Sequence, residues 1–167
     1  ARFKSSAGAR SAASVQFSGL ADAMRANPGE AGDIYLASPN NSASAYTLTD
    51  DWATQQSDTL VIADDCLATA CTPAQRAAFD MTVWRREVRS LLPQGAVTVT
   101  GNSSRGVNAT VAWFDKQFLD TTGAPGRSLV CAAGQTDSAE QANCCPADLT
   151  GDPALEHVRC TNVTFVP

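Results

Sequence analysis

The sequence of 167 residues is 44% hydrophobic and 17% charged, which suffices for one globular core. Its 12 Lys and Arg residues are outnumbered by 17 Asp and Glu residues, so the formal net charge is −5 at pH 7. Nucleic-acid binding normally needs clustered positive charge, and this composition therefore argues against a nucleic-acid partner. No stretch of the sequence approaches the roughly 20 apolar residues of a membrane span.

Residues 1–27 predict a helix. Apolar side chains recur at spacings of four, three and four residues and form one stripe, made of Ala13, Phe17, Leu20 and Met24. The sequence Asn27-Pro28-Gly29 predicts the end of the helix. Its beginning carries no capping residue before Phe3, and residues 1–12 contain no other large apolar side chain. We therefore expect the end of a longer helix, whose first part was removed together with an export signal.

Residues 29–65 have the composition of a loop with short extended pieces. Pro39, Asn40 and Asn41 predict a turn, whereas the apolar runs 33–36 and 59–62 predict two brief strands.

Residues 72–91 give the clearest helical signal. Thr72 can cap the helix, Pro73 suits its first position, and Gln75 completes a capping box. The apolar stripe again has helical spacing and predicts a core-facing side, made of Ala77, Met81, Trp84, Val88 and Leu91. Residues 93–95, Pro-Gln-Gly, predict the end of this helix.

The periodicity changes to two after Gly95. Residues 97–100 and 107–113 alternate apolar and small or polar side chains around a turn at 101–106, which predicts a β-hairpin. Further strands are expected near 128–131 and at 158–166, with a long irregular segment, 132–156, between them. The sequence therefore predicts an α+β fold: a long helix, a second helix, and an antiparallel sheet with a C-terminal region tied by cysteines.

The six cysteines predict disulfide bonds and an oxidising compartment. The sequence has no C-x-x-C pair and a single histidine, which makes a structural zinc site a poor alternative. Cys66 and Cys71 are close enough to close a small loop. A bond between the neighbours Cys144 and Cys145 is strained, so one of them should pair with Cys131 and the other with Cys160, in an order that the sequence leaves open.

Residues with catalytic or metal-binding chemistry are few. His157 is the only histidine, and there is no G-x-S-x-G motif, so we expect no enzymatic activity, no small-molecule substrate and no cofactor. The adjacent acids Asp50-Asp51 and Asp64-Asp65 are interpreted as solvated turn residues. Asp148 to Asp152, with Glu156, resembles a calcium loop only weakly because it lacks the alternating ligands of an EF-hand.

Two segments resemble one protein family. Residues 21–27, Ala-Asp-Ala-Met-Arg-Ala-Asn, resemble the end of the first helix in the PilV family of minor type IV pilins, whose usual form A-[DE]-R-M-R-A-N differs at Ala23. Residues 71–84 are similar to that family's segment C-T-x-x-Q-x-A-x-x-D-x-x-x-W, and the strand with Val111 and Trp113 fits its V-x-V-x-W strand. The resemblance covers residues 15–115, whereas 120–156 match less well.

The resemblance implies a type IV pilin-like fold, with residues 1–27 as the C-terminal half of the spine helix and 28–167 as the globular head. It implies six packing residues between helix and sheet: Ala13, Phe17, Leu20, Met24, Trp84 and Trp113. It also implies a removed apolar helix that anchors the head at the periplasmic side of the inner membrane, and later incorporation into the pilus. The implied function is initiating pilus assembly with other minor pilins and presenting a tip adhesin. A pseudopilin of a type II secretion system and a secreted disulfide-rich binding module are the alternatives.

Overall fold

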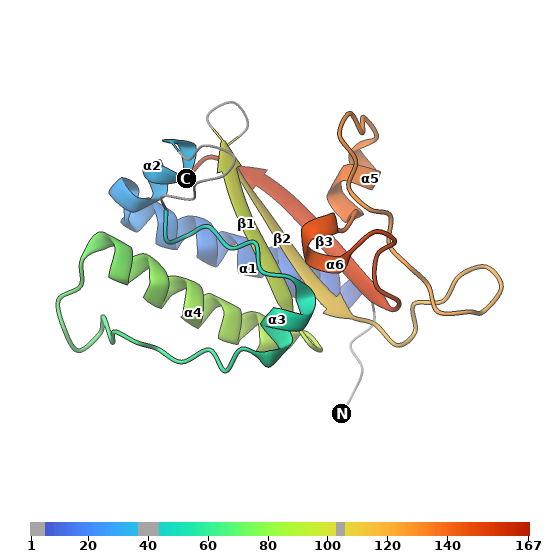
Figure 1. The fold of residues 1–167 in the computed structure, drawn as a ribbon, viewed down its shortest axis with the longest axis horizontal. Helices are drawn as coiled ribbons and strands as arrows, with labels where there is room; N and C mark the ends of the chain where they lie inside the picture. Colours follow the sequence, from blue (N-terminus) through green and yellow to red (C-terminus); the bar gives the residue numbers. More distant parts are fainter. Residues whose placement is uncertain (1–5, 37–43, 103–105) are drawn as a thin grey trace.

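The computed structural model describes residues 6–36, 44–102 and 106–167, and it confirms the α+β class with a long N-terminal helix, a three-stranded antiparallel sheet and three disulfides (Figure 1). The predicted start near Phe3, the turn at 39–41 and the tip of the hairpin lie outside the described residues. The elements in chain order are α1 (Ser6–Ala26), α2 (Pro28–Leu36), α3 (Trp52–Ser57), α4 (Pro73–Leu91), β1 (Ala96–Asn102), β2 (Gly106–Phe114), α5 (Ser138–Asn143), α6 (Ala147–Thr150) and β3 (Val158–Phe165).

The sheet has the order β1-β2-β3, with both pairs antiparallel. The predicted hairpin is confirmed, and its register places Val99 opposite Ala109, which in turn lies opposite Val163 of β3. Because side chains alternate between the two faces of a strand, these residues share one face, and that face packs against α1 and α4 in the main core.

The other face of the sheet is covered except near the tip of the hairpin, where Thr100, Asn108 and Thr164 are exposed. Ala96, Ala112, Val158 and Cys160 of the sheet form a second core with residues of the C-terminal region, which are Cys145, Leu149 and Ala154. The C-terminal region therefore lies against the face of the sheet opposite α1, as Figure 1 shows for α6.

The capping box of α4 is confirmed. The Thr72 hydroxyl accepts from the Gln75 N–H, and the Gln75 side chain accepts from the Thr72 N–H. One member of the predicted stripe is wrong, because Leu91 is exposed and Leu92 is buried. The helix ends at Leu91 and the chain continues in extended geometry, which turns the side chain of Leu92 into the core.

Both strands predicted between residues 29 and 65 are wrong. Residues 33–36 belong to α2, because Pro28 starts a second helix instead of ending helical structure, and the carbonyl of Asn27 accepts from the N–H of Ala31. Residues 59–62 form no strand, since the carbonyl oxygens of Asp58 and Leu60 accept from arginine side chains of α4. The short helix α3, capped by Asp51, was not predicted.

The C-terminal region is more regular than the sequence indicates. The final strand is confirmed as β3, but residues 128–131 contribute only an isolated bridge between Val130 and Cys145. Within 132–156 the chain forms α5 and α6. The carboxylate of Asp137 starts α5 by accepting from the N–H groups of Ala139 and Glu140.

Candidate functional site

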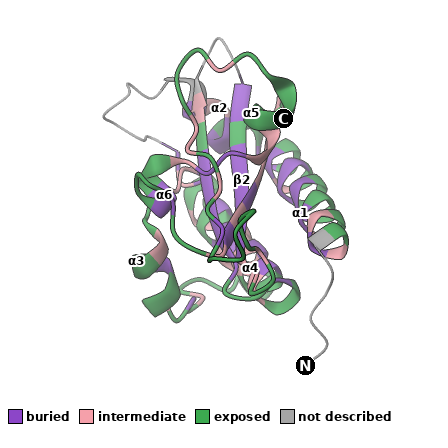
Figure 2. Ribbon diagram, turned by 90° about the vertical axis from the view of Figure 1, so that its right-hand side faces the viewer, coloured by how far each residue is buried: buried purple, intermediate pink, exposed green. Residues whose placement is uncertain are grey.

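One face of α1 is buried against the sheet and α4. The six side chains that the sequence assigns to helix–sheet packing lie in a single core cluster, and none is more than 8% exposed: Ala13, Phe17, Leu20, Met24, Trp84 and Trp113. Ala9 extends this cluster by one turn, which sequence reasoning missed because alanine is a weak apolar signal. Figure 2 shows α1 passing beside β2 with buried and exposed residues alternating along it. The helix therefore has a defined inner side over most of its length.

The opposite side of α1 is exposed and carries mostly small side chains. Val15 is 66% exposed, and the other exposed positions on this side include Ser11, Ser14, Ser18, Gly19, Asp22, Arg25 and Ala26. Its one ion pair among the described residues joins Arg25 to Asp22 at 3.0 Å within the helix. The side of a helix opposite an apolar stripe usually carries charged residues. The outer side of α1 instead carries mostly small, uncharged side chains, with Val15 at its centre, and it is not part of the core.

Arg10 lies at the N-terminal end of α1, between the two sides. Its guanidinium stands 5.9 Å from the ring of Trp113 and donates to the side-chain oxygen of Asn143 in α5. Burial, and to a smaller extent the positive charge of Arg159, lower the pKa of Arg10. This contact joins the start of α1 to the C-terminal region.

A buried polar cluster joins the other end of α1 to α4. The hydroxyl of Tyr46 accepts from the side-chain amide of Asn27 and lies 3.0 Å from a carboxylate oxygen of Asp80 and 3.2 Å from the carbonyl oxygen of Ala23. Burial is the main cause that raises the pKa of Tyr46 far above its usual range. Sequence reasoning missed this cluster because Tyr46 lies in a loop with no periodic pattern.

The outer edge of strand β1 forms hydrogen bonds with a backbone segment and with a side chain from outside the sheet. Leu48 and Val99 exchange two backbone hydrogen bonds of 2.9 Å. The buried side chain of Gln55 donates to the carbonyl of Val97 and accepts from its N–H, so one amide group takes the place of a strand residue. This edge is therefore unavailable for pairing with another chain.

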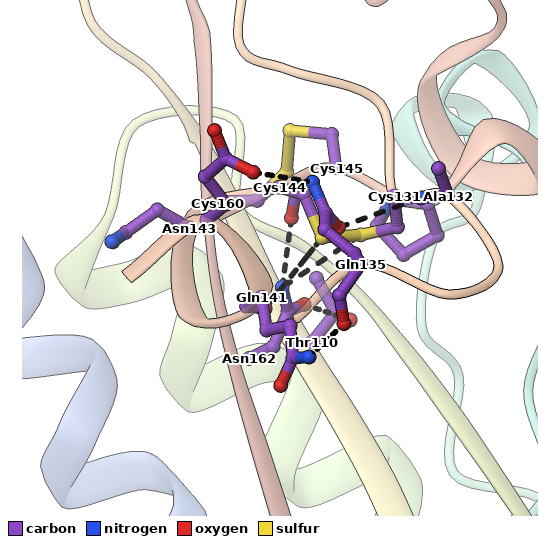
Figure 3. The surroundings of a disulfide bond; sticks show 12 residues. Thr110, Cys131, Ala132, Gln135, Gln141, Asn143, Cys144, Cys145, Cys160 and Asn162 are labelled. Carbon is purple, nitrogen blue, oxygen red and sulfur yellow. Dashed lines mark hydrogen bonds between the residues drawn. A yellow bond between two sulfur atoms is a disulfide. The ribbon is translucent and has the colours of Figure 1, made fainter. Parts of the chain in front are cut away.

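The three disulfides have different surroundings. Cys66–Cys71 closes a surface loop, and the outward pairing of the adjacent cysteines is confirmed as Cys131–Cys144 and Cys145–Cys160. Cys145 and Cys160 are fully buried. Figure 3 shows Asn162 beside the Cys131–Cys144 bond, where its amide donates to the carbonyls of Gln141 and Cys144 and its oxygen accepts from Thr110. This amide fixes α5 onto the sheet.

The structure does not bring together the residues with catalytic or metal-binding chemistry. His157 packs its ring against Phe114 and has a left-handed backbone, φ 60°. Glu156 forms an ion pair with Arg127, on the exposed surface. In the described parts of the chain, no three His, Cys, Asp or Glu side chains are grouped as metal ligands would be, and the calcium hypothesis for 148–152 gains no support.

A cavity of about 380 Å³ lies where the end of α1 meets the start of α4. It is lined by Ala23, Ala26, Asn27, Cys71, Pro73, Arg76 and Asp80. The carboxylate of Asp80 is neutralised by the guanidinium of Arg76 at 3.0 Å, which leaves the hollow polar but without a strong net charge.

Comparison with known proteins gives no relative: no family model, curated protein or solved structure matches the chain. Among the described helices, none combines the length and the apolar character needed to cross a membrane.

Proposed function

We propose that this chain is the head and lower spine of a PilV-like minor pilin, which helps to initiate type IV pilus assembly and to present a tip adhesin by protein–protein packing. The observation that carries the proposal is the two-sided α1. Its inner stripe from Ala9 to Met24 lies in the core against the sheet, whereas its outer side is smooth and exposed. A helix that is fixed to its own domain on one side and free on the other suits a subunit that packs helix against helix.

Two further features support the same function. The segments that resemble the PilV family meet where α1 ends and α4 begins, since the side-chain amide of Asn27 donates to the carbonyl of Pro73 at 2.8 Å. The three disulfides suit a protein that is exposed to an oxidising environment. The proposal includes an apolar helical segment before Ala1 in the full-length protein, anchorage in the inner membrane before assembly, and a place in the extracellular pilus afterwards.

The test uses the full-length gene in a strain that lacks its own copy. Val15→Glu places a charge on the outer side of α1, and Val166→Glu is the matched control, because both valines are largely exposed, at 66% and 72%. We expect the wild type and Val166→Glu to restore the number of pili per cell, and Val15→Glu to restore few. Immunoblots of the membrane fraction check that all three proteins accumulate equally.

The other outcomes identify other functions. Normal piliation without the gene, combined with a loss of protein secretion, would indicate a pseudopilin. A gene that encodes an ordinary cleaved signal peptide directly before the head, with no apolar helix, would contradict any pilin role and leave a secreted binding module.

A further inference from the structure

The loop closed by Cys66–Cys71 presents the most exposed large apolar side chain in the described parts of the chain. Leu67 is 81% exposed, and Val61, a few residues earlier, is 72% exposed. Ala63, Ala68 and Ala70 are exposed as well. Figure 1 shows this segment running along α4 and around its N-terminal end. We call residues 61–71 the knob.

The tip of the knob is held in one shape without being buried. The disulfide joins its ends, with a Cα–Cα distance of 5.5 Å. Asp65 accepts from the N–H of Leu67 through its carboxylate and from the N–H groups of Ala68 and Thr69 through its carbonyl, at 3.0 to 3.1 Å. A loop that is ordered before binding loses little conformational entropy on binding, so its apolar side chains are suited to contact a partner.

The knob is acidic. Asp64 and Asp65 are exposed, and neither forms an ion pair with another described residue. Arg76, the first cation along α4, is already paired with Asp80. A partner surface that is apolar at its centre and carries Lys or Arg at its rim therefore complements the knob.

The cavity at the end of α1 adjoins the knob, because Cys71 belongs to both. One partner surface can thus receive Leu67 and place a polar side chain beside Asn27 and Asp80. The knob and the cavity lie at the C-terminal end of α1, since Ala23, Ala26 and Asn27 form part of the cavity wall.

We propose that the knob and the adjoining cavity bind a partner protein through an apolar socket for Leu67 that is rimmed by basic side chains. The placement of that partner rests on the proposed function: the knob lies at the end of α1 farther from the proposed apolar segment before Ala1, so the partner there is the tip adhesin. The chemistry of the contact does not depend on it.

The experiment is photo-crosslinking of the full-length protein in its own cells. p-Benzoylphenylalanine replaces Leu67 in one variant and Leu129, which is 58% exposed in the C-terminal region, in the control. Mass spectrometry identifies the crosslinked protein and the peptide that was contacted. We expect one discrete adduct from position 67, absent from position 129, on a peptide with apolar side chains and at least one Lys or Arg.

A charge reversal tests the acidic part of the proposal. Asp64→Lys should reduce the adduct at least about tenfold, whereas Glu87→Lys, an exposed acid on α4, should leave it unchanged. Both variants should melt within about 2 °C of the wild type, because neither carboxylate forms an ion pair among the described residues. An equal adduct pattern at positions 67 and 129, a contacted peptide without basic residues, or an adduct insensitive to Asp64→Lys would overturn the proposal. A specific adduct with a protein unrelated to pili supports the knob and contradicts the proposed function instead.

Discussion

Trp84 donates a 2.9 Å hydrogen bond from its indole N–H to the backbone carbonyl of Gln16, which joins the middle of α4 to the middle of α1. Both side chains are buried, so water cannot replace this bond easily. The contact fixes how far α4 can slide along α1, since a displacement by one residue breaks it. It therefore reinforces the arrangement in which the apolar stripe of α1 faces the core and Val15 stays exposed.

Trp84→Phe should lower the free energy of unfolding by about 1 to 3 kcal/mol, because it removes the donor and some of the buried ring. Urea denaturation followed by circular dichroism measures the change. Trp52→Phe is the control, since Trp52 is only partly buried and should cost less. Equal losses for the two variants would contradict the role given to the bond.

Gln55→Glu should destabilise the protein by at least about 2 kcal/mol at pH 7. The amide nitrogen of Gln55 donates to the carbonyls of Asp50 and Val97 at 2.7 Å, and a carboxylate would instead face these two oxygens in a buried site. Burial raises the pKa of such a carboxyl, so the loss should shrink as the pH falls and the group is protonated. Unfolding at pH 7 and pH 4.5 checks both the size and the sign. The control is Gln56→Glu, because the amide of Gln56 donates to one carbonyl only, that of Gln94, at the exposed surface.

The features predicted correctly from the sequence have local signals. The capping box of α4 is encoded within Thr72 to Gln75, and the hairpin in the alternation of two neighbouring runs. The outward pairing of Cys144 and Cys145 follows from the geometry of adjacent residues, but the choice of partners depends on where α5 and β3 meet, which no local pattern records.

The features that were missed depend on contacts between distant residues. Asn27-Pro28-Gly29 predicts the end of the helix, whereas the chain bends there and continues as α2. The extended segment after α3 has its carbonyls bonded to side chains of Arg86 and Arg89, so its apolar residues form no strand. The inner stripe of α1 is predictable from its spacing. The cluster around Tyr46 is not, because it joins residues that are distant in the sequence and meet only in the folded chain.

Tyr46 should resist ionisation in the folded protein, because burial raises its pKa above the ordinary value near 10. The direction of the effect follows from linkage. Because the pKa of Tyr46 is higher in the folded protein than in the unfolded chain, the unfolded chain releases its proton first as the pH rises. The stabilisation of the folded protein is therefore complete below the pKa of the unfolded chain and is lost as the pH rises above it. Between about pH 9 and 11 the wild type should thus lose stability faster than Tyr46→Phe. Thermal melts over this range, with absorbance at 295 nm to follow tyrosinate, measure both effects. A normal titration of Tyr46 would show that the cluster with Asp80 is open to water.

The disulfides should be reduced in an order set by their burial. Cys66 and Cys71 are partly exposed, whereas Cys145 and Cys160 are fully buried. Mild phosphine reduction under native conditions, followed by alkylation and peptide mapping, should label Cys66 and Cys71 first and Cys145 and Cys160 last. The same treatment in denaturant should remove the order.

Replacing Cys145 and Cys160 by alanine should lower the free energy of unfolding by about 3 kcal/mol, as expected for a closed loop of about 15 residues.

Gly19→Ala should stabilise the protein, by about 0.5 to 1 kcal/mol, because alanine is the better helix former in the interior of α1. An added Cβ at Gly19 meets no atom within 4 Å, so the gain has no steric cost. Gly101→Ala is the contrasting control, since its Cβ would lie 3.0 Å from the side chain of Ile34 and should reduce stability. Urea denaturation compares the two variants, and a loss of stability in Gly19→Ala would contradict an open outer side of α1. A Gly19→Ala protein that is more stable yet restores fewer pili would then localise the defect to packing between helices of different subunits, because the variant changes nothing inside its own fold.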